Sequence, residues 1–184
     1  MDDPQWFYRN DDAWNVFVEQ LKYTACPHCK VVGALIQHGF LYGFDENHTK
    51  QQTHRAHRIF CSNRQELPGC GHTFSVWLAD TIRRLSLTAA GLWRFLHDAV
   101  ADGILAAIRD STCHLSDRTL RRLWRRFRHG QSHIRTTLAE RCPPPQLPSA
   151  HRPEAQTLAH LQAAFPDAPC PIAAFQHTLR TFFV

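Results

Sequence analysis

The stretch Cys26-Pro27-His28-Cys29 is a Cys-x2-Cys turn, and a second pair of cysteines, Cys61 and Cys70, follows it along the chain. Two thiolates in such a turn can bind one tetrahedral metal ion, and the proline stiffens the turn between them. The second pair ends in Pro68-Gly69-Cys70-Gly71, where the glycines let backbone amides turn toward a thiolate. The spacing predicts a zinc site formed by Cys26, Cys29, Cys61 and Cys70, which organises the first half of the chain.

Two other interpretations of these residues are open from the sequence. Either His28 or His72 could replace a cysteine as a ligand. The cysteines could instead form disulfides or stay as buried thiols. The chain starts Met1-Asp2-Asp3-Pro4 without a signal peptide, so we expect a reducing, cytoplasmic location in which Cys-x2-Cys pairs more often bind metal. The remaining cysteines have no partner at ligand spacing and are expected to be ordinary thiols: Cys113, Cys142 and Cys170.

Further short motifs surround the cysteines. They are Gln37-His38-Gly39-Phe40, Arg58-Ile59-Phe60-Cys61-Ser62-Asn63-Arg64, Gly69-Cys70-Gly71 and Thr73-Phe74. Together with Cys26–Cys29 they resemble the zinc ribbon of bacterial insertion-sequence transposases and their small DNA-binding accessory proteins. The resemblance covers residues 26–128 and implies that a helix-turn-helix follows the ribbon and that both bind a transposon end. The long catalytic domain of full transposases does not follow, which favours an accessory or regulatory factor of a mobile element.

The composition is that of a globular protein with an uneven charge distribution. The chain has 184 residues, 43% of them hydrophobic, and a formal net charge of +5. No apolar run approaches the roughly 20 residues of a membrane span, so we expect no membrane contact. The N-terminal part is acidic, whereas arginine dominates from residue 83 to 135 and lysine is absent there. This basic segment predicts a double-stranded DNA partner and a nucleoid-associated location.

Hydrophobic spacing predicts the elements of the first 80 residues. In the N-terminal segment, 1–25, Asp12 is expected to cap a helix that buries Trp14, Phe17, Val18 and Leu21. In the ribbon, 26–80, residues 31–44 are expected to form a hairpin broken by glycines, with strands at 58–61 and 73–78 returning beside it. Residues 45–57 contain three histidines among polar residues, and we expect an exposed loop here instead of a second metal site.

Residues 81–141 predict a three-helix bundle. The first helix begins after Thr88, with Leu87 and Leu92 at staple spacing, and ends at Gly103; a short second helix spans 104–110. Ser116 is expected to cap the third, 117–128, and Gly130 to end it before another helix at 132–141. The third helix carries six arginines within eleven residues, which predicts a DNA-recognition helix; a solvated basic helix is the alternative. These arginines are Arg118, Arg121, Arg122, Arg125, Arg126 and Arg128.

The C-terminal part begins with a proline-rich linker, 142–153, and continues as two amphipathic helices within 154–184. Two short helices cannot form a core alone, so we expect them to form a separate unit that docks on the body, on a second copy or on a transposition partner. The predicted fold class is therefore α+β, mostly α: a small zinc-ribbon sheet, a helix-turn-helix bundle and C-terminal helices.

No cluster of carboxylates, phosphate-binding loop or activated nucleophile indicates catalysis, and we expect a protein that is not an enzyme. The leading hypothesis is a zinc-dependent, sequence-specific double-stranded DNA-binding protein. The alternative is a zinc-ribbon adaptor that recruits a protein partner through its C-terminal helices. The target sequence, the choice between DNA and RNA, and the oligomeric state do not follow from the sequence.

Overall fold

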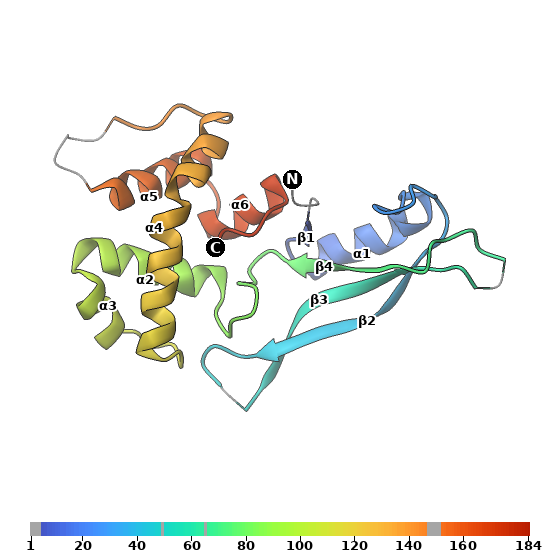
Figure 1. Cartoon of the computed structure of the whole chain (residues 1–184), viewed down its shortest axis with the longest axis horizontal. Coiled ribbons are helices and arrows are strands. Elements are labelled where there is room, and N and C mark those ends of the chain that lie inside the picture. The colour runs from blue at the N-terminus through green and yellow to red at the C-terminus, as the bar shows by residue number, and fades with distance from the viewer. Residues whose placement is uncertain (1–4, 49, 65, 147–151) are drawn as a thin grey trace.

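The computed structural model describes residues 5–48, 50–64, 66–146 and 152–184 and shows a four-stranded sheet beside a bundle of helices (Figure 1). The strands are β1 (Trp6–Tyr8), β2 (Leu35–Phe44), β3 (Gln52–Cys61) and β4 (Thr73–Leu78). The helices are α1 (Asp11–Gln20), the short 3-10 helix η1 (Leu21–Tyr23), α2 (Ala89–Ala101), α3 (Ile104–Arg109), α4 (Asp117–Ala139), α5 (Pro153–Ala164) and α6 (Pro171–Leu179). The α+β class is confirmed. Within these ranges no helix is both long and apolar enough to span a bilayer.

The sheet has the strand order β1-β4-β3-β2. Strands β2, β3 and β4 are antiparallel neighbours, and β1 pairs with β4 in parallel. The predicted hairpin within residues 31–44 is wrong, because 35–44 form one strand whose partner is β3, with Leu35 opposite Cys61 and Phe44 opposite Gln52. Gly39, with φ +148°, lies at a shift in register that leaves His38 as an extra residue, so this glycine makes a bulge and not a turn.

The exposed loop predicted for residues 45–57 is also wrong in its second half. The connection ends before Gln52, and β3 carries His54 and His57 into the sheet. His57 is buried and lies flat on the indole ring of Trp14, while His54 is half-buried. The polar composition was misleading because an imidazole ring packs as a flat aromatic surface when it faces a buried one.

The N-terminal segment is not only helical. β1 adds a strand to the sheet, and α1 covers one face of that sheet, with Trp14 and Leu21 buried against it. The cap of α1 is Asn10 and not the predicted Asp12: the Asn10 side-chain oxygen accepts a hydrogen bond from the backbone N–H of Ala13 at 3.0 Å. Residues 5–25 are therefore part of the four-stranded sheet and of the core beneath it.

The caps predicted for the bundle helices are confirmed. The hydroxyl of Thr88 accepts from the backbone N–H of Gly91 at the start of α2, and Ser116 caps α4 in the same way. The predicted end of the third helix at Gly130 is wrong, since α4 continues unbroken to Ala139. A glycine in a helix interior costs only about 1 kcal/mol. The buried stripe of α4 continues through Ile134 and Leu138, whose burial outweighs that cost.

The C-terminal helices are not a separate unit. α5 and α6 pack on α4 and α2, and their apolar residues belong to the same core (Figure 1). The side-chain amide of Gln176 donates to the carbonyls of Ala79 and Thr81, at 2.7 and 3.0 Å, and joins α6 to the end of β4. Pro153, assigned to the linker, starts α5. Residues 147–151 of the linker lie outside the described residues. Docking on the body is thus the arrangement found; contact with a second copy or a partner through 154–184 stays a prediction.

Candidate metal centre and candidate nucleic-acid interface

The structure brings the four predicted cysteines together in one group. Their sulfur atoms all lie within 4.8 Å of one another. Cys26 Sγ lies 3.8 Å from Cys70 Sγ, and Cys29 Sγ lies 3.7 Å from Cys61 Sγ. A tetrahedral ion with Zn–S bonds of about 2.3 Å separates its sulfurs by about 3.8 Å. The geometry is therefore suitable for a metal ion with four thiolate ligands, and the alternative of two disulfides does not occur, because all four cysteines are free.

The first pair is presented by a tight turn between α1 and β2. The backbone N–H of Lys30 donates to the carbonyl of Cys26, and the N–H of Cys26 donates to the carbonyl of Val31, both at 2.9 Å. Lys30 takes the left-handed conformation with φ +64°, which reverses the chain directly after Cys29. The two sulfurs therefore point to the same side of the turn, as one metal ion requires.

The second pair is presented by the end of β3 and the loop that follows. The backbone N–H of Cys70 donates to the sulfur of Cys61 at 3.3 Å. Gly71 has φ +75°, a backbone conformation that favours glycine. Its backbone N–H donates to the carbonyl of Cys61. A Cβ at Gly69 would collide with the carbonyl of Ser62, so this position has no room for a side chain. The predicted role of the two glycines is thus supported by the local geometry.

The thiols of this group differ in their readiness to lose a proton. A hydrogen bond from the backbone N–H of Val31 lowers the pKa of Cys29 to about 7, whereas burial raises the pKa of Cys61 to about 12. Cys26 and Cys61 are fully buried. Several thiolates so close together need a compensating positive charge, and a divalent cation deprotonates a coordinating thiol outright.

Neither of the alternative histidine ligands belongs to the group. Within the described residues, the one set of converging Cys, His and carboxylate ligand atoms consists of the four cysteines. His28 and His72 instead stack on each other beside it, with ring centroids 4.9 Å apart. The other three cysteines lie elsewhere in the fold, as predicted. The site is therefore a four-sulfur arrangement with two ring side chains at its rim.

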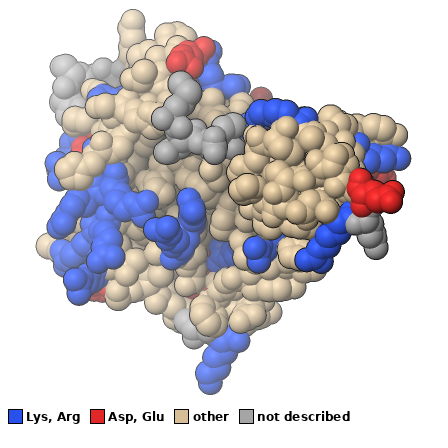
Figure 2. Space-filling model, turned by 45° about the vertical axis from the view of Figure 1, so that its right-hand side comes forward, with Lys and Arg blue, Asp and Glu red and all other residues tan. Residues whose placement is uncertain are grey.

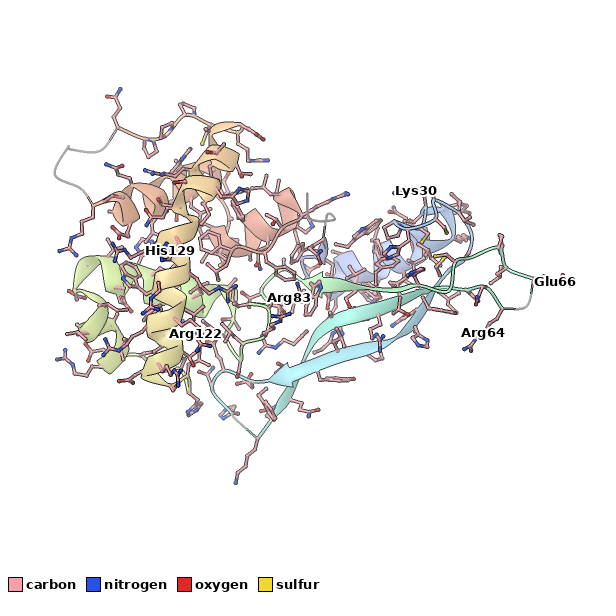
Figure 3. The ribbon with its side chains drawn as sticks, in the orientation of Figure 1. Lys30, Arg64, Glu66, Arg83, Arg122 and His129 are labelled. Carbon is pink, nitrogen blue, oxygen red and sulfur yellow. The ribbon has the colours of Figure 1, made fainter. Side chains whose placement is uncertain are left out.

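The six arginines predicted to bind DNA all lie exposed on α4. The opposite face of the helix is anchored in the core by Leu120, Leu123 and Phe127. At 100° per residue, Arg118, Arg122, Arg125 and His129 form one ridge that points away from this buried stripe. Figure 2 shows a broad group of blue side chains on the left, with others spread over the rest of the view, and Figure 3 labels Arg122 and His129 along α4.

Arg128 differs from the other five arginines. Its guanidinium nitrogen lies 2.8 Å from a carboxylate oxygen of Glu154 at the start of α5, whose side chain is 11% exposed. In the described part of the chain, no other arginine of the six has an ion pair. Arg128 thus holds α5 on α4, while the remaining five offer uncompensated charge to the solvent.

A contact that the sequence did not predict joins the β2–β3 loop to the start of α4. His114 Nε2 donates to the carbonyl of Asn47, in the loop between β2 and β3, at 2.7 Å. The carboxylate of Glu46 in the same loop accepts from the backbone N–H of Thr88, at the start of α2, at 2.6 Å. These residues carried no recognisable motif, because their roles depend on partners about 40 to 70 positions away. The loop fixes the N-terminal end of α4 relative to the ribbon.

The buried Arg55 strengthens this joint. It is the extra residue at a second shift in register, between β2 and β3, and its guanidinium donates to the carbonyls of Phe44 at 2.6 Å and Leu87 at 3.4 Å. Burial lowers its pKa, and the nearby acidic groups Asp80, Glu46 and Asp45 act in the opposite direction. The sheet and the helical bundle are therefore joined by buried polar contacts.

Comparison with known proteins gives no relative for this chain: no family model matches it, and neither a curated protein nor a solved structure is significantly similar.

Proposed function

We propose that this chain binds double-stranded DNA through α4, with a zinc ion at the four cysteines holding the ribbon in place. The observation that carries the proposal is the exposed arginine ridge of α4. Five arginines without an ion pair in the described part of the chain stand on a helix whose other face is locked in the core. Such concentrated charge is repulsive unless anions are bound, and duplex DNA supplies regularly spaced phosphates.

The shape of the ridge is compatible with a duplex groove. Arg118 and His129 are eleven residues apart, which corresponds to about 16 Å along a helix axis. The major groove is about 12 Å wide and admits one α-helix, whose N-terminal part usually reaches the base edges. We assign Arg122 to a base contact and the other four unpaired arginines of α4 to phosphate contacts: Arg118, Arg121, Arg125 and Arg126. α2, α3 and α4 then form the helix-turn-helix.

The metal has a structural role in this proposal. Tetrahedral four-sulfur sites are typical of zinc or of iron–sulfur centres, and a single ion with four thiolates has no open position for a substrate. Zinc would close the ribbon by joining the turn at Cys26 and Cys29 to the end of β3. The loop at Glu46 and Asn47 that contacts the start of α4 lies at the opposite end of β2 and β3, so the metal would act on it through the stability of the sheet. Loss of metal would weaken DNA binding indirectly, through misplacement of α4.

The test is a titration of duplexes of varied sequence at several salt concentrations. If four to six phosphates are neutralised, log K should fall with log salt with a slope of roughly −4 to −5. Arg122→Ala should weaken binding to the preferred duplex by about 1 to 3 kcal/mol and relax the base preference at one position. Arg64→Ala is the matched control, because Arg64 is in the loop after β3 at the far end of the molecule (Figure 3).

Weak and equal affinity for every duplex, or equal effects of Arg64→Ala and Arg122→Ala, would contradict the proposal. The link to transposition rests on the sequence resemblance of residues 26–128. Selection from random duplexes tests it separately: the enriched sequence should match the ends of a mobile element. Enrichment of an unrelated sequence would retain the DNA-binding proposal and remove the role in transposition.

A further inference from the structure

The strand β2 forms an open edge of the sheet. In the strand order β1-β4-β3-β2, the described residues give β2 one hydrogen-bonded neighbour, β3. The other edge is covered: Gln5, next to β1, donates to the carbonyl of Arg180 at 2.8 Å, and the ring of Phe7 lies 5.1 Å from that of Phe182. Figure 1 shows β2 at the outside of the sheet, with no helix beyond it.

The composition of β2 is unusual for an edge. None of its ten residues carries a formal charge and none is proline, although charged residues and proline are the usual protection of an exposed edge. Large exposed apolar side chains gather on it. Of the eight found among the described residues, four belong to this strand: Ile36, Phe40, Tyr42 and Phe44.

Two aromatic side chains of β2 pack against histidine rings of the neighbouring strand β3. Phe40 is opposite His57 and Tyr42 is opposite His54, so the four rings share one face. Ring centroids are 5.2 Å apart for Phe40 and His57 and 6.0 Å apart for Tyr42 and His54. His57 in turn stacks on the buried Trp14. Phe40 and Tyr42 remain 47% and 59% exposed although they rest on this rigid support.

We propose that β2 pairs with β2 of a second copy of this chain in an antiparallel, two-fold symmetric arrangement. Antiparallel pairing of one edge with itself is self-complementary, and an uncharged strand has nothing that repels its own copy. Residues 40–44 of β2 are regular, because the register shift beside them comes from the extra residue Arg55 of β3. Pairing centred on Leu41 sets Phe40 of one copy opposite Tyr42 of the other, on the same face.

Other occupants fit the edge less well. A nucleic acid would bring phosphates to a strand that has no lysine or arginine. A strand from a different protein is compatible with the hydrogen bonds of the edge, but only a second copy supplies the same uncharged aromatic sequence on both sides. The dimer would also present two copies of α4, as two-fold symmetric DNA sites require. It does not depend on DNA binding, since β2 and α4 are different surfaces.

The test is the solution mass of the metal-loaded full chain, by light scattering and sedimentation over a range of concentrations. The wild type should reach twice the chain mass of 21.2 kDa. The double variant Phe40→Lys, Tyr42→Lys should stay at the mass of one chain, with unchanged metal content and circular dichroism. Leu105→Lys is the matched control, because Leu105 is a 65% exposed apolar residue on α3, and it should leave the dimer intact.

Hydrogen exchange adds a readout that does not depend on variants. Backbone amides of residues 39–44 should become more protected as the concentration rises, while those of β4 should not change. A wild type that stays at the mass of one chain at every concentration overturns the inference. It is overturned equally if that single chain instead binds a different protein or a single-stranded oligonucleotide. A dimer that persists in the double variant also overturns it, because such a dimer uses another surface. Neither result bears on duplex binding by α4.

Discussion

The imidazole ring of His57 lies flat on the indole ring of Trp14, with ring centroids 3.4 Å apart and an interplanar angle of 3°. This stack joins β3 to α1 at the centre of the ribbon core. The side-chain amide of Gln37 on β2 lies 3.3 Å from His57 Nδ1. The ring of His57 on β3 is therefore held in one orientation by groups from two other elements, α1 and β2.

His57 should make folding stability fall in mild acid. Burial lowers its pKa to about 4, with the charge of His54 as a second cause, although Asp11 acts in the opposite direction. An unfolded histidine has a pKa of about 6.5, so below that pH the unfolded state binds the proton first. Stability should decrease by up to about 2 kcal/mol between pH 6.5 and pH 5.

Chemical denaturation at several pH values checks this prediction. His57→Gln removes the titrating group, so the variant should lose much of the decrease while it keeps the same metal content. Direct titration of the ring by NMR should give a value well below 6.5. Parallel pH curves for the variant and the wild type would show that another group is responsible.

The four cysteines should bind one zinc ion per chain. Removal of a structural zinc forfeits on the order of 10 kcal/mol, more than a small domain can lose and stay folded. Cys26→Ser and Cys61→Ser should therefore lose both the metal and the ribbon fold. Elemental analysis of freshly purified protein is the measurement.

Three variants serve as controls for the metal prediction. Cys113→Ser removes a thiol outside the group, and His28→Ala and His72→Ala remove the two stacked rings beside it. All three should retain one metal ion. Folded wild-type protein without metal would reject the site, and loss of zinc with His72→Ala alone would make that ring a ligand.

Gly130→Ala should stabilise the protein by roughly 0.5 to 1 kcal/mol. Gly130 lies inside α4, and an added Cβ would meet Ile134 at 3.9 Å, which is an ordinary contact. The gain comes from the lower conformational entropy of alanine in the unfolded chain. Thermal or chemical unfolding gives the difference. Gly69→Ala is the contrasting variant, because its Cβ would collide with the Ser62 carbonyl; it should destabilise the ribbon.

Arg128→Ala should reduce both folding stability and DNA affinity, whereas Arg122→Ala should reduce DNA affinity alone. The substitution removes the partner of the nearly buried Glu154 carboxylate. Because the guanidinium is largely exposed, the expected loss of folding stability is about 1 kcal/mol. The double variant Arg128→Ala, Glu154→Gln should recover part of that stability. Equal unfolding free energies for Arg128→Ala and Arg122→Ala would show that the ion pair has no structural role.

The sequence alone was sufficient for features with local causes. The Cys-x2-Cys turn and the caps at Thr88 and Ser116 depend on residues within a few positions of each other. The second cysteine pair lies 32 to 44 positions from its partners in the group and was recognised by residue type, since cysteine pairs are typical metal ligands. The apolar stripe of α4 is likewise visible as a spacing of three and four residues. For the caps and the stripe, the physical requirement, an unsatisfied backbone N–H or one buried helix face, is met within a short segment.

Only the tertiary structure decided the elements that depend on distant partners. β1 is a strand because β4 accepts it in parallel, and His54 and His57 enter a strand because β2 and α1 offer partners and a buried face. Gly130 stays helical because the core holds α4 on both sides of it. The C-terminal helices belong to the bundle because α4 and α2 cover their apolar faces. Burial and strand pairing between distant segments outweigh local preference, and a sequence does not state which distant segments will meet.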